Sequence, residues 1–344
     1  MKRRRWGLVI CSFEKAVDHL VLALLLAPFC TPLDAFAQSA HEVCAKTPAS
    51  KHRINVKDRG AKGDGRTDDT AAVQKAIDEV SGTGRTVLVP NGIYMINAVG
   101  ERRLSLRNNT TLRLSEGATL KEGHYAVLTI AGVSNVTVIG GLLEGDRDKH
   151  QGAAGEWGMG IRIERGARHI TIAGVTARKM WGDGFYIEGA KDVTLCAVVA
   201  DHNRRQGLSV IEVDGLVVTN SVFKNTRGTR PSAGIDLEPD RTSQTIANVR
   251  IAYSKFLDNV GPGILISGQK GADNFSNVEI AGNLFRGTPP VKIKYAPGVS
   301  DSAICRNRYI VRLEPSPNLA SVASRSEEVT LIAGCGDPGL RTRQ

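Results

Sequence analysis

The sequence predicts an all-β fold: a parallel β-solenoid with three faces and a helical cap at its N-terminal end. Three observations predict it. A glycine followed by alternating apolar residues recurs in steps of 23 to 29 residues, at Gly160, Gly184, Gly207, Gly234 and Gly263. Two further short alternating segments follow each glycine, and such strands bury their apolar sides only by stacking on neighbouring copies. No segment between them has the 3.6-residue period of a helix, which excludes an α/β barrel.

The first 37 residues have the pattern of a secretory signal peptide. Basic residues at 2–5 precede an apolar stretch at 20–27, and a small-residue cleavage site lies at 35–37. No later stretch has the ~18 uninterrupted apolar residues of a membrane span. We therefore expect an exported protein, periplasmic or secreted, without stable membrane insertion.

After this segment, residues 38–314 are expected to form one β-helix domain, and residues 315–344 a C-terminal cap or tail. Residues 63–78 begin with turn and N-cap residues and continue with apolar residues on one helical face, which predicts the capping helix. Such a helix would cover the unpaired strand edges at the open end of the stack.

Polar residues lie directly before the second strand of several repeats and predict a ladder of stacked turns: Asn135, His169, Asp192, Asn248 and Asn277.

Charge and cysteine content limit the partners and cofactors. The chain has 45 Lys and Arg against 35 Asp and Glu, and without residues 1–37 its net charge of +10 becomes +8, which favours an anionic partner.

Outside the signal segment the cysteines are Cys44, Cys196, Cys305 and Cys335. Of their three possible pairings, Cys305–Cys335 is favoured as a clamp on the C-terminal end. No CxxC spacing occurs, which argues against a zinc site.

The segment around the predicted cap carries a family resemblance. INVKDRGAKGDGRTDDTAAVQKAID at 54–78, followed by TVLVPNGIY at 86–94, resembles the opening of the pectate lyase superfamily. That superfamily consists of right-handed parallel β-helices and includes polygalacturonase-type glycoside hydrolases. The coils up to about residue 295 are compatible with it. The resemblance implies a right-handed parallel β-helix that is exported and acts on a polysaccharide.

The catalytic motifs of the polygalacturonase family are matched in part. That family carries Asn-Thr-Asp-Gly, Asp-Asp, Gly-His-Gly and Arg-Ile-Lys on successive coils. Trp181-Gly182-Asp183-Gly184 resembles the first motif, and Lys292-Ile293-Lys294 resembles the last, with Lys292 at the arginine position. The segment Arg204-Arg205-Gln206-Gly207 departs from the family, because it has neither an aspartate pair nor a histidine. GIDLEPD at 234–240 would have to supply the missing carboxylate.

In each repeat the first strand is the one that follows the recurring glycine. Its outward positions, and those of the turn before it, place aromatic, acidic and basic residues on one face. Aromatic platforms suit the apolar side of a sugar, and charged groups suit acid–base catalysis or recognition of a uronate. The candidate catalytic residues are Asp183, Asp236, Glu238 and Glu188. The candidate substrate-binding residues are Trp157, Trp181, Tyr186, Arg204, Arg205, Arg230, Lys292 and Lys294. Glu164, Glu188, Ile211 and Glu238 are expected in one column.

The expected spacing of the carboxylates favours hydrolysis. Asp183 and Asp236 are two coils apart, which is ~9.6 Å along the stack and near the upper end of the ~6.5–9.5 Å range of inverting glycosidases. Glu188 and Glu238 have the same gap. Glu164 and Glu188 are one coil apart, at ~4.8 Å, nearer to the retaining spacing. We therefore predict a metal-free and cofactor-free hydrolase of an acidic, uronic-acid-containing polysaccharide, with Asp183 and Asp236 as acid and base.

Two other functional classes remain open. A lyase of this superfamily would use a basic residue to abstract a proton next to a uronate carboxyl, with calcium held by Asp183, Asp236 and Glu238. A non-catalytic adhesin or glycan-binding solenoid would use the same face for contact alone. Nucleic acid is not expected as a partner, because the protein is expected to be exported and its basic residues alternate with acidic ones.

Overall fold

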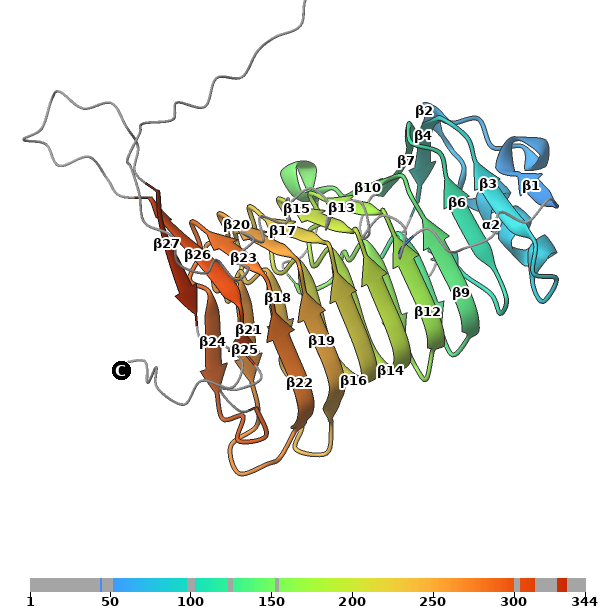
Figure 1. Ribbon diagram of the computed structural model, residues 1–344. Coiled ribbons are helices and arrows are strands. Elements are labelled where there is room, and N and C mark those ends of the chain that lie inside the picture. Colours follow the sequence, from blue (N-terminus) through green and yellow to red (C-terminus); the bar gives the residue numbers. More distant parts are fainter. Residues whose placement is uncertain are drawn as a thin grey trace, which may run out of the picture. The chain divides into compact units, whose positions relative to one another are not determined.

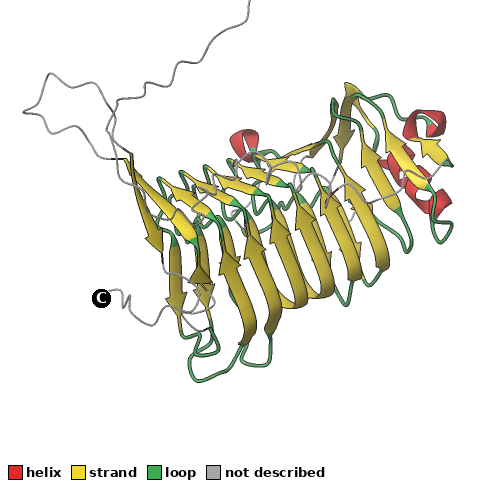
Figure 2. Ribbon diagram, viewed as in Figure 1, coloured by secondary structure: helices red, strands yellow, loops and turns green. Residues whose placement is uncertain are grey.

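The computed structural model describes residues 44, 52–97, 103–122, 126–151, 155–299, 304–312 and 327–332, all within one compact unit, Ala40–Gln344. Within these residues the chain winds into stacked coils of short strands, shown in Figure 1 and coloured by element type in Figure 2. The predicted parallel β-solenoid is confirmed. The predicted signal segment lies outside the described residues. No helix in the described part is long and apolar enough to cross a bilayer.

Each coil contributes strands to three faces. The first face contains β5 (Leu104–Ser105), β8 (Leu128–Ala131), β11 (Ile161–Glu164), β14 (Phe185–Cys196), β16 (Leu208–Thr219), β18 (Ile235–Leu237), β21 (Ile264–Ser267) and β24 (Val291–Lys294). The second contains β1 (Arg53–Asn55), β3 (Thr86–Val89), β6 (Thr111–Leu114), β9 (Ser134–Ile139), β12 (Arg168–Ala173), β19 (Ile246–Ala252), β22 (Phe275–Ala281) and β25 (Ile304–Cys305). β14 and β16 are long enough to continue from the first face into the second, so the two faces form one sheet.

The third face is a separate sheet. It contains β2 (Asp64–Asp68), β4 (Gly92–Ile96), β7 (Ala118–Glu122), β10 (Leu142–Glu144), β13 (Thr176–Arg178), β15 (Val199–Asp201), β17 (Val222–Lys224), β20 (Lys255–Leu257), β23 (Leu284–Arg286) and β26 (Asn307–Arg312). β27 (Glu327–Ile332) pairs with β26 in the antiparallel direction and so ends the parallel order. The rest of the predicted C-terminal cap or tail, 315–326 and 333–344, lies outside the described residues.

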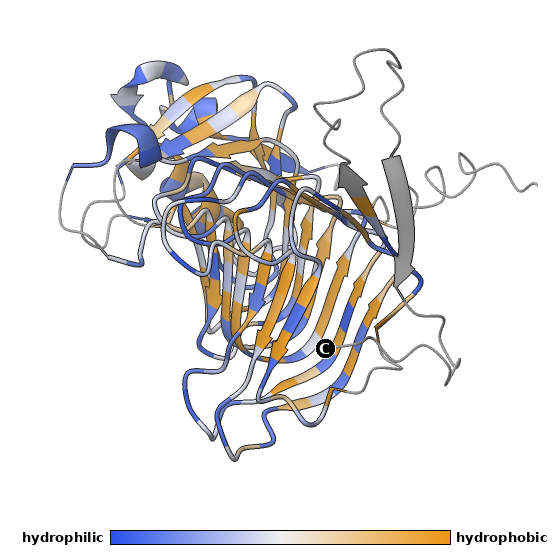
Figure 3. Cartoon of the chain, turned by 90° about the vertical axis from the view of Figure 1, so that its left-hand side faces the viewer, coloured by the Kyte–Doolittle hydropathy of each residue, from blue (hydrophilic) through white to orange (hydrophobic). Residues whose placement is uncertain are grey.

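Apolar side chains that point inward along the strands form one continuous core, and Figure 3 shows these hydrophobic positions along the stacked strands. Phe223, Phe256 and Phe285 occupy equivalent positions in three successive coils of the third face. Their rings stack with centroids 5.4 and 4.9 Å apart. Because neighbouring strands lie ~4.8 Å apart, aromatic rings in one column meet at a distance that suits stacking.

The helix α2 (Thr70–Val80) overlaps the predicted segment 63–78 and extends two residues beyond it, and the start of that segment forms β2, after the short helix η1 (Val56–Arg59). Its Val73, Ala76, Ile77 and Val80 are buried. Gln74 fixes the helix to β5, because its side-chain amide both donates to Ser105 O at 3.0 Å and accepts from Ser105 N at 2.8 Å. That the helix shields the end of the stack stays a prediction.

The predicted ladder of stacked turns is confirmed. Asn135, His169, Asp192, Asn248 and Asn277 all have the left-handed backbone conformation, with φ between 49° and 57°. Their side chains bond along the stack: Asn135 Nδ2 donates to Asn109 Oδ1 at 2.9 Å, and Asn277 Nδ2 donates to Asn248 Oδ1 at 2.8 Å. Asn and Asp tolerate this conformation better than other side chains, which explains their recurrence before the second strands.

The cysteines pair in a way that joins distant parts of the chain. Cys44 forms a disulfide with Cys196 at the end of β14, with the two Cα atoms 5.7 Å apart and 152 residues between them in sequence. Cys305 is also disulfide-bonded. Cys335 lies outside the described residues, so the pairing of Cys305 with Cys335 stays a prediction.

Candidate functional site

The strand register brings the predicted residues to one face. Residues in equivalent positions of successive first-face strands are Arg162, Tyr186, Ser209, Asp236, Leu265 and Lys292. Asp236 and Lys292 therefore share a column and lie two coils apart. Asp183 lies two residues before the start of β14, the strand that carries Tyr186. Asp183, Asp236 and Lys292 thus lie on one side of the solenoid, as the repeat predicts.

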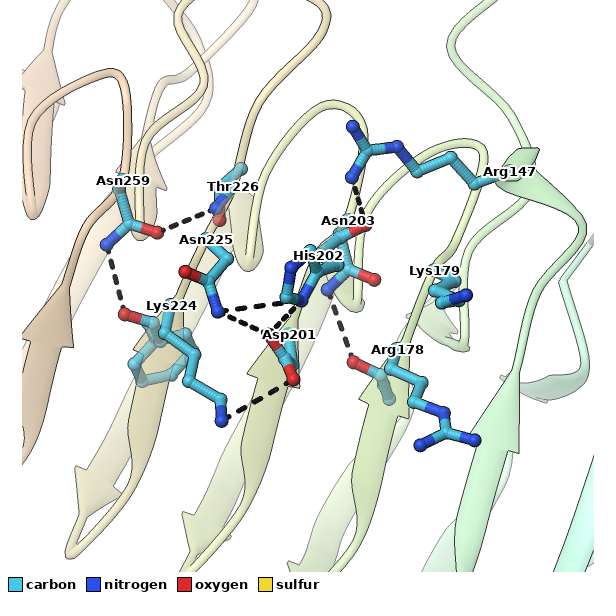
Figure 4. A network of polar contacts seen from close by, with 12 residues as sticks. Arg147, Arg178, Lys179, Asp201, His202, Asn203, Lys224, Asn225, Thr226 and Asn259 are labelled. Atoms are coloured by element: carbon cyan, nitrogen blue, oxygen red, sulfur yellow. Dashed lines mark hydrogen bonds and ion pairs between the residues drawn. The ribbon is translucent and has the colours of Figure 1, made fainter.

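A buried amide positions the turn that carries Asp183. Asn203 Oδ1 accepts a hydrogen bond from Met180 N at 3.0 Å, and its Nδ2 donates to Ala177 O at 3.3 Å. Figure 4 shows Asn203 beside this turn, with Asn259 making a similar backbone contact further along the stack. A Cβ on Gly184 would lie 2.7 Å from Asn203 Nδ2 and from Gly207 O. Only glycine leaves room for these groups, which is the physical reason for a glycine after Asp183.

Asp183 is fully buried and paired with Arg205. Arg205 Nη1 lies 3.0 Å from Asp183 Oδ2, and its Nη2 lies 2.9 Å from Glu156 Oε2. Burial raises the pKa of Asp183 to about 6, although Arg205 and Ser209 act in the opposite direction. Asp183 Oδ1 has no hydrogen-bond partner among the described residues. Asp183 is therefore ionised at neutral pH and keeps one oxygen able to accept a proton.

Asp236 is also buried, with 2% of its surface exposed, but its surroundings favour the protonated form. Gln206 Nε2 donates to Asp236 Oδ2 at 3.1 Å, and Gln206 Oε1 accepts from Ala233 N at 2.8 Å. Burial, followed by the charge and the hydrogen bond of Glu238, raises the pKa of Asp236 to about 8. Asp236 thus keeps its proton at neutral pH, where Asp183 has lost its own.

A third group of side chains continues the site along β11 and β14. Tyr186 Oη donates to Glu188 Oε2 at 3.0 Å, and the Arg162 guanidinium lies 5.1 Å from the centre of the Tyr186 ring. Burial, together with the negative charge of Glu188, raises the pKa of Tyr186. Burial and Glu188 also raise the pKa of Asp240, which follows Glu238 in the GIDLEPD segment. The centre of this face is therefore rich in carboxylates.

The column that was expected to contain Ile211 is different in the structure. Glu188 pairs with Glu212, because the ladder between β14 and β16 has register shifts at Ile187/Glu188 and at Glu188/Ala190. One extra residue in β16 moves Ile211 out of the column, and Ile211 is buried. Glu164 is paired opposite Glu188 as expected, but it is 4% exposed and forms an ion pair with Arg162 at 2.7 Å.

Two of the predicted substrate-binding residues contact each other. The Trp181 ring is stacked against His150, with centroids 3.9 Å apart, and the Arg204 guanidinium carbon lies 3.9 Å from its centre. Arg204 also donates to Trp181 O at 2.5 Å, to Gly155 O and to Thr229 Oγ1. These contacts occupy Trp181 and Arg204 within the protein and tie the turn of Arg204 to the turns that carry Trp181, Gly155 and Thr229. Their proposed role in gripping substrate stays a prediction.

The other predicted binding residues are exposed. Trp157 has 36% of its surface exposed, and Arg230 lies on the turn before β18. Lys292 and Lys294 point outward from β24. In the described part of the chain, no group of three or more His, Cys, Asp or Glu side chains is arranged to hold a metal ion.

Sequence reasoning missed Glu156 as part of this site. It lies on the long turn between β10 and β11, after the helix η2 (Arg147–Lys149), and it reaches Arg205 from two coils earlier in the stack. The turn has no strand periodicity, so no column position could be given to Glu156. Its place beside Trp157, already a candidate, was the one available signal.

Comparison with known proteins shows the family. The family model Rhamnogalacturonase A/epimerase, pectate lyase-like, matches residues 53–227, which is half of the chain. The chain belongs to this pectate lyase-like family of parallel β-helices. The resemblance carried by residues 54–94 is thereby confirmed.

Individual relatives are distant. YclG of Bacillus subtilis (strain 168), an uncharacterized protein, is 26% identical over 285 residues, which cover 68% of this chain and 49% of YclG. The mannuronan C5-epimerase AlgE4 of Azotobacter vinelandii is 35% identical over 189 residues, covering 50% of this chain and 33% of AlgE4. The chain thus spans about half, or less, of these curated relatives.

Solved structures share the fold. The exopolygalacturonase of Thermotoga maritima superposes with a TM-score of 0.58 at 14% identity, covering 75% of this chain and 73% of that one. PfbA, a surface adhesin of Streptococcus pneumoniae, superposes with a TM-score of 0.54 at 21% identity, covering 68% and 63% of the two chains. The same fold therefore occurs in an enzyme and in an adhesin.

Proposed function

We propose that this protein is an exported carbohydrate-active enzyme that hydrolyses glycosidic bonds in an acidic, uronic-acid-containing polysaccharide. One observation carries the proposal: two buried carboxyl groups on one face have pKa values on opposite sides of neutral pH, about 6 for Asp183 and about 8 for Asp236. Paired carboxyl groups whose surroundings separate their pKa values are the usual acid and base of a glycosidase. The names mannuronan C5-epimerase and exopolygalacturonase both point to uronic-acid polymers.

In the proposed reaction the two carboxyl groups have different roles. Asp236 gives its proton to the oxygen that leaves as the glycosidic bond breaks. Asp183 accepts a proton from the water whose oxygen forms the new bond to the anomeric carbon. The separation of two coils, ~9.6 Å before lateral offset, leaves space for that water and favours inversion at the anomeric carbon. Arg205 holds Asp183 in place and balances its charge.

The lyase alternative has less support where it would use Arg205 as its base. Among the basic residues of the site, Arg205 lies nearest to Asp183, and it is bonded to both Asp183 and Glu156. Burial acts to lower the pKa of Arg205, but the charges of these two carboxylates outweigh it, so that the pKa of Arg205 is raised above its ordinary value. A base for proton abstraction needs a lowered pKa, so Arg205 is poorly suited to that role.

A panel of uronic-acid and neutral polysaccharides tests the proposal. The purified protein is incubated with each polymer, with and without chelator, and both reducing ends and the absorbance of unsaturated uronates are followed. Hydrolysis produces reducing ends without absorbance. Absorbance would instead indicate a lyase, and binding without any product would indicate an adhesin-like protein. Either of these results overturns the proposal.

The pH dependence of hydrolysis provides a second test. We expect kcat/KM to rise as the pH passes about 6, where Asp183 loses its proton, and to fall above about 8, where Asp236 loses its own. Initial rates between pH 4 and pH 10, at a fixed ionic strength, would show the two limbs. The Asp183→Asn variant should lack the acidic limb in its residual activity. A profile that falls steadily from pH 5 would contradict this assignment.

A further inference from the structure

Gln206 is a buried amide that lies between the two carboxyl groups of the site. It is on the turn before β16, in the coil between those of Asp183 and Asp236. Burial raises the pKa of Asp183, and a hydrogen bond from the backbone N–H of Gln206 acts in the opposite direction. The side-chain Nε2 of Gln206 donates to Asp236 Oδ2 at 3.1 Å. One fully buried residue therefore contacts both groups of the proposed acid–base pair.

The surroundings of Gln206 leave its side-chain amide only one orientation. Gln206 Oε1 accepts a hydrogen bond from Ala233 N at 2.8 Å. A backbone N–H is a donor only, so a reversed amide would bring two donors together and leave both buried without an acceptor. Oε1 therefore faces Ala233, and Nε2 presents an N–H to Asp236. A hydrogen-bond donor is thus fixed on one side of the Asp236 carboxyl group.

This fixed donor determines which oxygen of Asp236 carries the proton. Oδ2 accepts from Gln206 and is the acceptor oxygen of the carboxyl group, which leaves Oδ1 to hold the proton. Asp236 Oδ1 accepts no hydrogen bond from the described residues, as expected for an oxygen that donates one. Glu238 is hydrogen-bonded to Asp236 and accepts this proton in the free protein.

The other neighbours of Asp236 are compatible with this arrangement. The charged groups that face it are Glu238, Arg205 and Asp183. In its column the adjacent residues are Ser209 on β16 and Leu265 on β21, and neither carries a charge. Arg205 is bonded to Asp183, so its guanidinium does not take the place of Gln206 as the donor to Oδ2.

We propose that Gln206 is a positioning residue, which holds the proton of Asp236 on Oδ1 and ties the coil of Asp183 to that of Asp236. The inference rests on the proposed function and deepens it, because it assigns the orientation of the general acid to a residue that is itself buried. Gln206 acts through Asp236 and not by contact with the polymer. In the reaction the leaving oxygen replaces Glu238 as the acceptor of the Oδ1 proton.

Exchange of the amide and the acid tests this orientation without any substrate. Gln206→Glu places an acceptor where Asp236 receives its donor, so the two carboxyl groups stay in contact only while they share a proton. Addition of Asp236→Asn restores the contact, because the introduced amide can donate an N–H to the introduced carboxylate. Urea unfolding at pH 5 and at pH 9 compares the wild type, Gln206→Glu and the double variant.

Relative to the wild type, we expect the urea midpoint of Gln206→Glu to be about 0.5 to 1 M lower at pH 9 than at pH 5. This is the size expected for loss of a hydrogen bond to a charged group. Folding raises the pKa of the paired carboxyl groups, so the stabilisation from their shared proton is present at pH 5 and is lost as the pH rises. At pH 9 the double variant should recover most of the difference.

Two outcomes at pH 9 bear directly on the assigned orientation. If Gln206→Glu yields no folded protein there, recovery of folded protein by Asp236→Asn is the expected rescue. A double variant that is no more stable than Gln206→Glu would overturn the proposal, because Nε2 of Gln206 would then not face Asp236.

Asn283→Asp is the matched control for burial of a carboxyl group. Asn283 is also fully buried, and its Oδ1 accepts from Ser254 N at 2.9 Å while its Nδ2 donates to Ile251 O at 2.9 Å. It lies on the turn between β22 and β23, away from the first face. Asp236→Asn should leave the stability of Asn283→Asp unchanged. Equal rescue of both variants would contradict a specific contact between Gln206 and Asp236.

Hydrolysis of the most active polymer of the panel gives a second readout. Gln206→Glu should lower kcat about 10- to 100-fold with little change in KM, because the proton moves to the wrong oxygen. The basic limb of its pH profile should move to higher pH, since a second carboxylate lies beside Asp236. A wild-type kcat and pH profile in this variant would overturn the positioning role.

Failure of the proposed function looks different from failure of this inference. If Asp236→Asn rescues the stability of Gln206→Glu but the wild type releases no reducing ends from any polymer, the orientation of Gln206 stands and hydrolysis does not.

Discussion

The Asp236→Asn variant should lose hydrolytic activity by about 10²- to 10⁴-fold, the usual contribution of a positioned general acid. Asn has nearly the shape of Asp and can keep the contact with Gln206, but it has no proton to give to the leaving oxygen. Because the loss concerns the transition state, kcat should fall while KM changes little. Initial rates on the most active polymer of the panel measure both constants.

A matched control separates this effect from a general loss of charge. Asp258→Asn removes a half-exposed carboxylate that faces Arg286 at 3.7 Å, on a turn three coils from Asp183. We expect that variant to keep wild-type activity. Activity of Asp236→Asn within a factor of ten of the wild type would exclude Asp236 as the general acid.

The Asp236→Asn substitution should not impair folding. The pH dependence of the free energy of unfolding checks this expectation. Folding raises the pKa of Asp236 to about 8 from an unfolded value of ~3.9. Its favourable contribution is therefore complete below pH ~3.9 and is lost as the pH rises towards 8. Asn does not titrate, so the stability of the variant relative to the wild type should increase between pH 4 and pH 8. Urea unfolding at both pH values would show it.

Removal of the Cys44–Cys196 disulfide should lower the free energy of unfolding by up to about 5 kcal/mol, from the chain-entropy model for a loop of this length. The disulfide joins a segment before the first coil to the end of β14, so the coils between them unfold as one closed loop. Without the bond the unfolded chain gains freedom, and the folded state loses a link between separate coils.

Urea unfolding of Cys44→Ser, Cys196→Ser and the double variant tests this prediction. Each single variant should be destabilised as much as the double variant, because either substitution breaks the same bond. A much smaller effect for Cys44→Ser than for Cys196→Ser would show that burial of Cys196, and not the disulfide, stabilises this part of the solenoid.

The parts of the fold that repeat could be predicted from the sequence. Gly184 recurs in register with four other glycines because a side chain there would collide with the next coil, so the repeat reports a steric requirement of the stack. Once the repeat was fixed, strand spacing placed Asp183, Asp236 and Lys292 on one face. The stacked turns followed from the recurrence of polar residues before the second strand of each repeat.

The parts that do not repeat could not be predicted. Glu156 reaches Arg205 from a long turn whose path depends on the loops around it. Arg204 contacts Trp181, Gly155 and Thr229, so it joins turns of different lengths. The register shift next to Glu188 depends on one extra residue in β16. The separation of the pKa values of Asp183 and Asp236 depends on burial, which alternation alone does not measure.

The stacking of coils also restricts how this site can evolve. Since each coil adds one residue to every column, the spacing of two carboxylates along the axis changes only in integer multiples of the strand separation. Loss of the single coil between Asp183 and Asp236 would shorten their axial gap from ~9.6 to ~4.8 Å, close to the separation found in retaining glycosidases. Duplication or deletion of a whole rung is thus a discrete route by which such a protein could exchange one stereochemical outcome for the other.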